Sequence, residues 1–147
     1  MLTARISDYV AVIATLDPQT ITSGPTYSGV VDMSLWTHVR ATLMLGDMAS
    51  ETCDFAVYTC ADSSGNTPVS LKACTQLAAS ATTHDNKQLI IDLLPDELNA
   101  VLEATRYIKF GVTVGGSGGP AAILVEGIPR HSGGITSNNA TVVQVKE

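Results

Sequence analysis

Residues 106–127, RYIKFGVTVGGSGGPAAILVEG, decide the fold class of this chain. Every second position of the first part is apolar, so these side chains share one face of a strand: Ile108, Phe110, Val112 and Val114. A glycine cluster follows at residues 115–119, and a short apolar run occupies residues 121–126. Two strands joined by about five residues that include glycine predict a β-hairpin.

The glycine cluster at residues 115–119 also allows a second interpretation, a loop that binds phosphate. Such a loop is followed directly by a helix, whose N-terminus aims backbone N–H groups at the phosphate, and by a Lys and a Ser or Thr. Here Pro120 and a short β-like run follow instead. The hairpin interpretation is therefore favoured, and we expect no nucleotide at this loop.

Similar apolar runs, separated by turn-forming residues, continue through the rest of the chain. The predicted strands are residues 9–16, 27–33, 39–45, 52–60, 69–77 and 87–93, although the alanines of 69–77 also permit a helix. A proline and two acidic residues then predict one short helix near residues 95–104. This pattern predicts a mainly β protein, an antiparallel β-sandwich of the jelly-roll type.

The core is predicted at the in-phase apolar positions of the central strands. These positions are Val39, Leu43, Phe55, Val57, Leu89, Ile91, Ile108, Phe110 and Val112.

The chain of 147 residues predicts one sandwich domain at residues 1–134, with an N-terminal arm at 1–8 and an extended C-terminal arm at 135–147. A polar, glycine-rich stretch at residues 131–140 precedes a short β-favouring run at residues 141–145, so this run can return to its own sheet or reach the edge of a neighbour's sheet. Arg130 can anchor a carboxylate of a partner or of its own fold. The candidate partner contacts are Arg130, Thr141, Val142, Val143 and Val145.

The composition limits the classes of partner. Hydrophobic residues make up 45% and charged residues 15% of the chain, which predicts a surface poor in charge and suited to being covered. The net charge of −6 disfavours a nucleic-acid partner. No apolar run approaches the roughly 20 residues of a membrane span, and no leader-like segment is evident, so we expect synthesis in a cytoplasm and no membrane partner.

The titratable residues predict no catalytic constellation. The three cysteines lack paired spacing and are interpreted as small buried hydrophobes, and the three histidines fit no metal motif. His84 and Asp85 lie in a turn-like stretch, and Asp96 and Glu97 are explained as first-turn charges of the short helix. Trp36 is interpreted as a packing residue. We therefore expect no catalytic residue, metal or cofactor, and no enzyme activity.

The order of the motifs resembles that of small virion structural proteins of tailed bacteriophages, in particular capsid cement or decoration proteins with a jelly-roll-like β-sandwich. The resemblance covers roughly residues 27–131 and rests on GVVDM, Trp36 with THVRATLML, FAVYTCADSSGN, LIIDLLPDEL, RYIKFGVTV and AAILVEGIPR. It implies a protein of the virion's outer capsid surface, which binds the major capsid protein, self-associates as a dimer or trimer, and cements neighbouring capsomers against the pressure of packaged DNA.

Three other functions stay open at this point. The chain can be a carbohydrate-binding or adhesion module displayed on a virion, and in that case glycan binding would depend on Trp36 or Tyr58. It can be a neck or tail component, since these share similar sandwiches. A small hydrolase is the third alternative. A gene for a major capsid protein next to this one would favour the capsid interpretation.

Overall fold

The computed structural model describes residues 5–22, 24–79, 83–100, 105–130 and 138–143. Three 3-10 helices fall within these residues, η1 (Ile6–Asp8), η2 (Met33–Leu35) and η3 (Pro95–Ala100). The strands are β1 (Ala11–Ile21), β2 (Thr26–Tyr27), β3 (Val31–Asp32), β4 (Trp36–Leu45), β5 (Cys53–Cys60), β6 (Val69–Ala73), β7 (Gln88–Leu93), β8 (Tyr107–Val114) and β9 (Gly119–Pro129).

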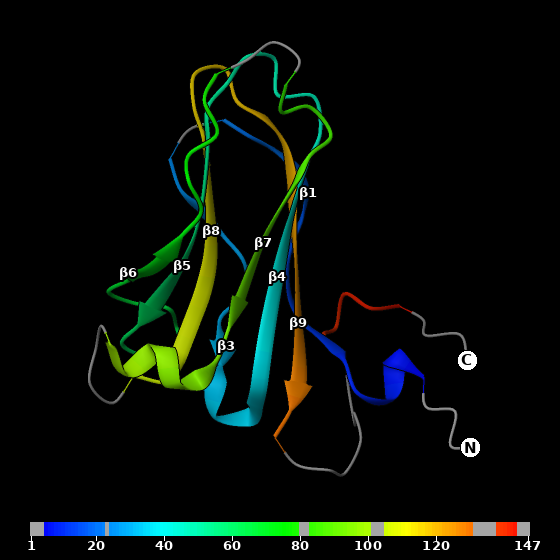
Figure 1. Cartoon of the computed structure of the whole chain (residues 1–147), viewed down its shortest axis with the longest axis vertical. Helices are drawn as coiled ribbons and strands as arrows, with labels where there is room; N and C mark the ends of the chain where they lie inside the picture. The colour runs from blue at the N-terminus through cyan, green and yellow to red at the C-terminus, as the bar shows by residue number, and fades with distance from the viewer. Residues whose placement is uncertain (1–4, 23, 80–82, 101–104, 131–137, 144–147) are drawn as a thin grey trace.

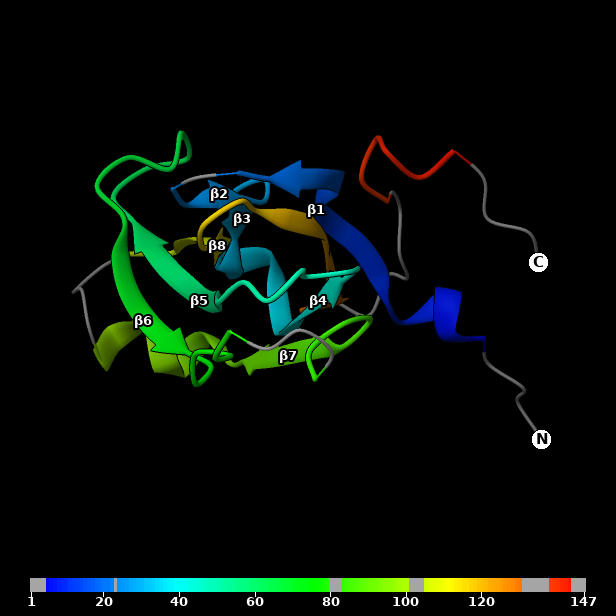
Figure 2. The ribbon, with the colours of Figure 1, turned by 90° about the horizontal axis from the view of Figure 1, so that it is seen from above.

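The strands form two antiparallel sheets that face each other as a sandwich (Figures 1 and 2). Sheet A has the order β1-β9-β4-β7, and sheet B has the order β2-β8-β5-β6, with β3 also paired to β8. Strands β2 and β3 thus act as two halves of one interrupted strand. β1 pairs with β9, β2 and β3 pair with β8, β4 pairs with β7, and β5 pairs with β6. This nested pairing is the jelly roll, so the predicted fold class is confirmed.

The core lies between the sheets and consists of the inward alternate positions of both. Eight of the nine predicted core residues are at most 3% exposed, and the ninth, Leu89, is half-buried against them. The rings of Phe55 and Phe110 meet at the centre, with their centroids 6.3 Å apart. The period-two pattern therefore identified the inner faces correctly.

The predicted hairpin at residues 115–119 is wrong. Strand β8 pairs within sheet B, whereas β9 pairs with β1 and β4 in sheet A, so the glycine loop crosses from one sheet to the other. The loop is held from one side, because the backbone N–H of Ser117 donates to Glu51 Oε1 at 2.7 Å and that of Gly115 donates to the carbonyl of Thr52 at 3.0 Å. A short loop can span the roughly 10 Å between packed sheets. The alternation of apolar and polar residues and the length of the loop therefore do not distinguish a crossover between sheets from a hairpin within one sheet.

Several element boundaries also differ from prediction, and the strand expected at residues 27–33 is divided into β2 and β3. Strand β1 continues through Pro18 to Ile21, because a register shift between Leu16 and Gln19 on this edge strand tolerates the missing N–H of proline. Strand β6 ends at Ala73. The expected short helix is the 3-10 helix η3, and its predicted continuation over residues 101–104 lies outside the described residues.

The edge strands β6 and β7 are tied together across the open side of the sandwich. Lys72 Nζ of β6 donates to the backbone carbonyl of Asp92 at 3.2 Å and forms an ion pair with the carboxylate of Glu97 in η3. Glu97 also accepts the backbone N–H of Leu94 at 2.8 Å. The hydrogen bond from Lys72 is the largest cause that holds the pKa of Glu97 below its usual value, and the hydrogen bond from the backbone of Leu94 is the second.

All the strands fall within the predicted domain at residues 1–134, and the division into that domain and two arms stays a prediction. Within the part of the chain that is described, no helix is long and apolar enough to cross a membrane.

Candidate interaction face

The two outer faces of the sandwich differ in their apolar exposure. On sheet A, Met44, Ile90 and Ile128 point outward and are 39%, 45% and 41% exposed. On the outer face of sheet B no large hydrophobic side chain of the described residues is exposed to this degree. Met44 and Ile90 lie in neighbouring rows of the sheet, and Ile128 lies on the far side of Arg40. Because exposed apolar side chains gathered on one outer face indicate an association surface, sheet A carries the candidate site.

The strand register arranges the outward residues of sheet A in rows, which we call the sheet A face. One row contains Gln88, Met44 and Ala122, and the next contains Ile90, Thr42, Leu124 and Thr15. The following row contains Asp92, Arg40, Glu126 and Val12, and the last contains His38 and Ile128.

Strand β9 explains why this face is apolar. Its sequence from Ala121 to Val125 is apolar at every position, so both its inner and its outer face lack charge. Continuous apolar runs are typical of strands that are covered on both sides, whereas a strand with one solvated face alternates. The outer side of β9 therefore has the composition of a covered surface.

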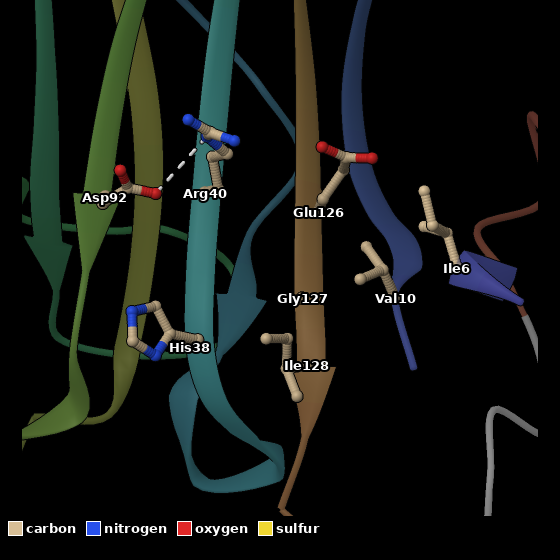
Figure 3. A pocket seen from close by; sticks show the side chains of 8 residues that line it. All are labelled: Ile6, Val10, His38, Arg40, Asp92, Glu126, Gly127 and Ile128. Atoms are coloured by element: carbon tan, nitrogen blue, oxygen red, sulfur yellow. Dashed lines mark ion pairs between the residues drawn. The ribbon is translucent and has the colours of Figure 1, made fainter. Parts of the chain in front are cut away.

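A row of alternating charge crosses the sheet A face (Figure 3). Arg40 lies between the two acidic residues, and its Nε is 3.5 Å from Asp92 Oδ1 in an exposed ion pair. Glu126 is paired in register with Arg40, but its carboxylate has no hydrogen bond or ion pair within the described residues. The face thus presents one carboxylate that no side chain of the described residues pairs with.

Two hollows indent the same face. One, of about 370 Å³, lies around the charged row and is bordered by Ile6 of η1, Val10, and Ile128 (Figure 3). The other, of about 520 Å³, lies at the far end between Pro18 of β1 and Met44 of β4. The face is therefore contoured and can interlock with a complementary surface.

The described part of the C-terminal arm lies against the free edge of β1. Asn138 Oδ1 accepts the backbone N–H of Val12 at 2.9 Å, and the backbone N–H of Asn139 donates to the carbonyl of Val12 at 2.7 Å. Asn139 Nδ2 donates to the carbonyl of Ile13 at 3.2 Å, which a register shift in β1 leaves out of the ladder to β9. The arm therefore covers this part of an open sheet edge.

The predicted partner contacts are not gathered into one site. Arg130 is exposed after β9, and its backbone N–H donates to the carbonyl of Leu35 at 2.9 Å. Thr141 lies in a turn, where its N–H and hydroxyl donate to Asn139 Oδ1, and Val143 is 97% exposed. Val142 is half-buried, and Val145 lies outside the described residues. Their role as partner contacts stays a prediction.

Asparagines 138 and 139, which fasten the arm, were missed by the sequence analysis. Asparagine is well suited to bond backbone groups in turns, but this preference does not identify the group that it bonds. No feature of the sequence points from these residues to β1, because the contact joins segments 126 residues apart.

Two tyrosines cover a glycine on the outer face of sheet B. Tyr27 and Tyr58 have ring centroids 5.5 Å apart at an angle of 86°, and a side chain at Gly111 would lie within 3 Å of both rings. Lys109 Nζ lies 3.9 Å from the centroid of Tyr27. Burial, followed by the neighbouring Tyr27 and Asp54, raises the pKa of Tyr58. This pair of tyrosines, the aromatic cluster, is a half-exposed aromatic surface on the outer face of sheet B.

The tryptophan and the two buried cysteines that were considered as functional residues lie in packed positions of the fold. Trp36 is half-buried, with its ring against Gly127, which fits the predicted packing role. Cys53 and Cys60 are buried, and burial raises the pKa of the Cys53 thiol to about 11, so this thiol is unreactive near neutral pH. Among the described residues no group of His, Cys, Asp or Glu is placed to hold a metal ion, and His131 lies outside them.

Comparisons with known proteins show the fold. No protein-family model and no curated protein matches the chain. Over 99% of its length the chain is similar to the PBSX exported protein XepA, with a TM-score of 0.53 and 10% identity, and it spans 46% of that chain. Weaker likenesses are to a CBM4 structure (TM-score 0.44, 15% identity, 86% of this chain and 77% of that chain) and to a Broad Bean Stain Virus structure (0.42, 8%, 95% and 97%).

Proposed function

We propose that this chain is a non-enzymatic virion structural protein that binds the outer surface of a phage capsid and cements neighbouring capsomers against internal pressure. The observation that carries the proposal is the unequal apolar exposure of the two outer faces, with Met44, Ile90 and Ile128 all on sheet A. A sandwich that exposes large apolar side chains on one of its outer faces is suited to assembly.

Two further observations support the proposal. The jelly roll is the fold that the motif order of residues 27–131 implies for cement and decoration proteins. The acidic net charge of −6 also suits a position on the outside of a shell, away from packaged DNA. The partners we propose are the major capsid protein and further copies of this chain.

In this proposal the two ends of the chain fasten the sandwich to the shell. The described end segments, η1 and residues 138–143, lie on the same side of the sandwich, beyond β1 (Figures 1 and 2). Arg130, Thr141, Val142, Val143 and Val145 are the proposed contacts to the capsid. Many weak contacts on a lattice act together, so even a micromolar single contact can give lasting attachment.

The test uses particles of the encoding virus that were assembled without this protein. Purified full-length protein is added, and occupancy and resistance of the particles to heat are measured, with a variant that lacks residues 135–147 beside it. We expect the full-length protein to bind and to raise heat resistance. The truncated protein should fold and lose occupancy. No binding of the full-length protein would refute the proposed function, whereas equal binding of both forms would refute only the role of the arm.

A second candidate function, carbohydrate binding, is favoured by the aromatic cluster. Tyr27 and Tyr58 are half-exposed over Gly111, and amphipathic rings on a sheet face can stack on sugars. A glycan array tests this candidate with the wild type and with Tyr58→Ala. Strong hits that Tyr58→Ala removes would support glycan binding, and an array without hits would count against it. Trp36→Ala is a poor probe, because Trp36 packs against Gly127.

A further inference from the structure

We propose that the sheet A face is the surface through which two copies of this chain pair, related by a two-fold axis that runs along the strands between β4 and β9. The inference rests on the proposed function, which requires copies to associate, and it names the surface and the residues. Sandwich sheets that pack face to face keep their strand directions within about 30° of each other, which this axis satisfies.

The charged row is complementary to itself under this symmetry. A rotation about an axis between β4 and β9 places β4 of each copy over β9 of the other. Since Arg40 and Glu126 are paired in register, Arg40 of each copy then lies opposite Glu126 of the second copy. Two equivalent ion pairs form, and each neutralises a Glu126 carboxylate that has no partner within the described residues of its own chain.

Arg40 can make this second contact without leaving Asp92. The ion pair within the chain uses Nε, 3.5 Å from Asp92 Oδ1. A guanidinium carries five N–H donors, so the terminal nitrogens remain for a second carboxylate. In the separated chain the side chain of Arg40 is 51% exposed, which leaves it accessible to a partner.

The same rotation brings the two rows that contain Met44 and Ile90 against those of the second copy. Thr42 lies opposite Leu124 of the second copy, and Met44 lies opposite Ala122. Ile90 approaches Thr15 at the margins, because β7 of one copy faces β1 of the other. The side chains that are exposed in one copy are therefore covered in the pair.

The area is sufficient for a dimer of moderate strength. Four strands spaced about 4.8 Å apart and a length of 10 residues in β4 give a face of about 19 by 33 Å, or about 600 Å² in each copy. The pair would bury about 1,200 Å² in total, at the lower end of specific interfaces. We expect a dimer that dissociates at micromolar concentrations.

The test exchanges the charges of the reciprocal pair. Sedimentation velocity measures the dissociation constant of the dimer for the wild type, Arg40→Glu and Glu126→Arg, while circular dichroism checks that each variant is folded. We expect each single variant to raise the dissociation constant at least about tenfold, because like charges then face each other twice. Thr113→Glu, on the outer face of sheet B, is the control and should leave the dimer unchanged.

Mixing the two variants isolates the contact between copies. The glutamate introduced at position 40 of one variant then faces the arginine introduced at position 126 of the other. The native Glu126 of the first variant likewise faces the native Arg40 of the second, so the mixture should form a heterodimer although each variant alone is monomeric. A wild type that dimerises while the mixture stays monomeric would overturn the inference, and so would a dimer that neither single variant weakens.

A variant at an uncharged residue of the same face provides the test if a charge reversal prevents folding. Thr42 is at the centre of the face and is not part of the charged row, so Thr42→Lys should abolish the dimer and leave the fold intact. A wild type that is monomeric at 100-fold above micromolar concentration, on the order of 0.1 mM, would overturn the inference. If such a monomer still binds deficient particles, and Thr42→Lys removes that binding, the face belongs to the capsid and the proposed function stands.

Discussion

The crossover loop at residues 115–118 gives a prediction in which two glycines with similar backbone angles respond differently to the same change. Gly118 and Gly24 have φ angles of +83° and +71°, so alanine at either position pays the steric cost of a left-handed conformation, about 1–2 kcal/mol. A Cβ at Gly24 meets nothing within 4 Å. A Cβ at Gly118 would lie 2.1 Å from the carbonyl oxygen of Ile21 and 2.8 Å from Thr22 Cα.

That overlap has to be relieved by moving backbone at the end of β1, and overpacking costs about 1–3 kcal/mol more. We therefore expect Gly24→Ala to lower the free energy of unfolding by about 1–2 kcal/mol and Gly118→Ala to lower it by about 2–5 kcal/mol. Urea denaturation followed by the fluorescence of Trp36 measures both. If Gly118→Ala costs no more than Gly24→Ala, the described path of the crossover beside Ile21 is refuted.

Three other predictions concern the core, the edge contact and the loop. Phe110→Ala should lower the free energy of unfolding by about 3–5 kcal/mol, because the ring is fully buried, and a loss under about 1 kcal/mol in urea denaturation would place it outside the core. Glu97→Gln should cost about 0.2–1 kcal/mol at pH 7, since its ion pair with Lys72 is partly exposed. The pKa of Glu97 is lowered in the folded state, so this stabilisation is present above the unfolded pKa and is lost as pH falls through the folded pKa. The free energies of unfolding of the wild type and of Glu97→Gln should therefore converge in acid. A difference between them that does not change with pH would contradict the contact. Asp96→Asn is its control. Millimolar ATP should leave the melting temperature of the protein unchanged. A rise in the melting temperature would indicate that residues 115–119 bind phosphate.

The inner faces of the strands were predictable because burial imposes a period of two. Phe55 and Phe110 lie where the alternation places them, since each strand has one face toward the same core. The sheet to which each strand belongs was not predictable in this way. Strands β8 and β9 both point apolar residues at the core from opposite sides, and the pattern of each is the same in a hairpin and in a crossover.

The candidate site was predictable only in part. The low charge of the chain indicated a covered surface, and the unbroken apolar run of β9 indicates which strand carries it. The row of Asp92, Arg40 and Glu126 depends on the register of three strands that are distant in sequence, so no local pattern contains it. The same is true of the contact between Asn138 and Val12.

The most direct test of the central claim is a cryo-electron microscopy map of virions of the encoding virus, compared with a map of particles assembled without this protein. The proposed function predicts additional jelly-roll density on the outer capsid surface, in contact with neighbouring capsomers, in the complete virions alone. If virions that contain this protein lack such density on the capsid, or if mass spectrometry finds none of the protein in purified virions, the proposed function is contradicted.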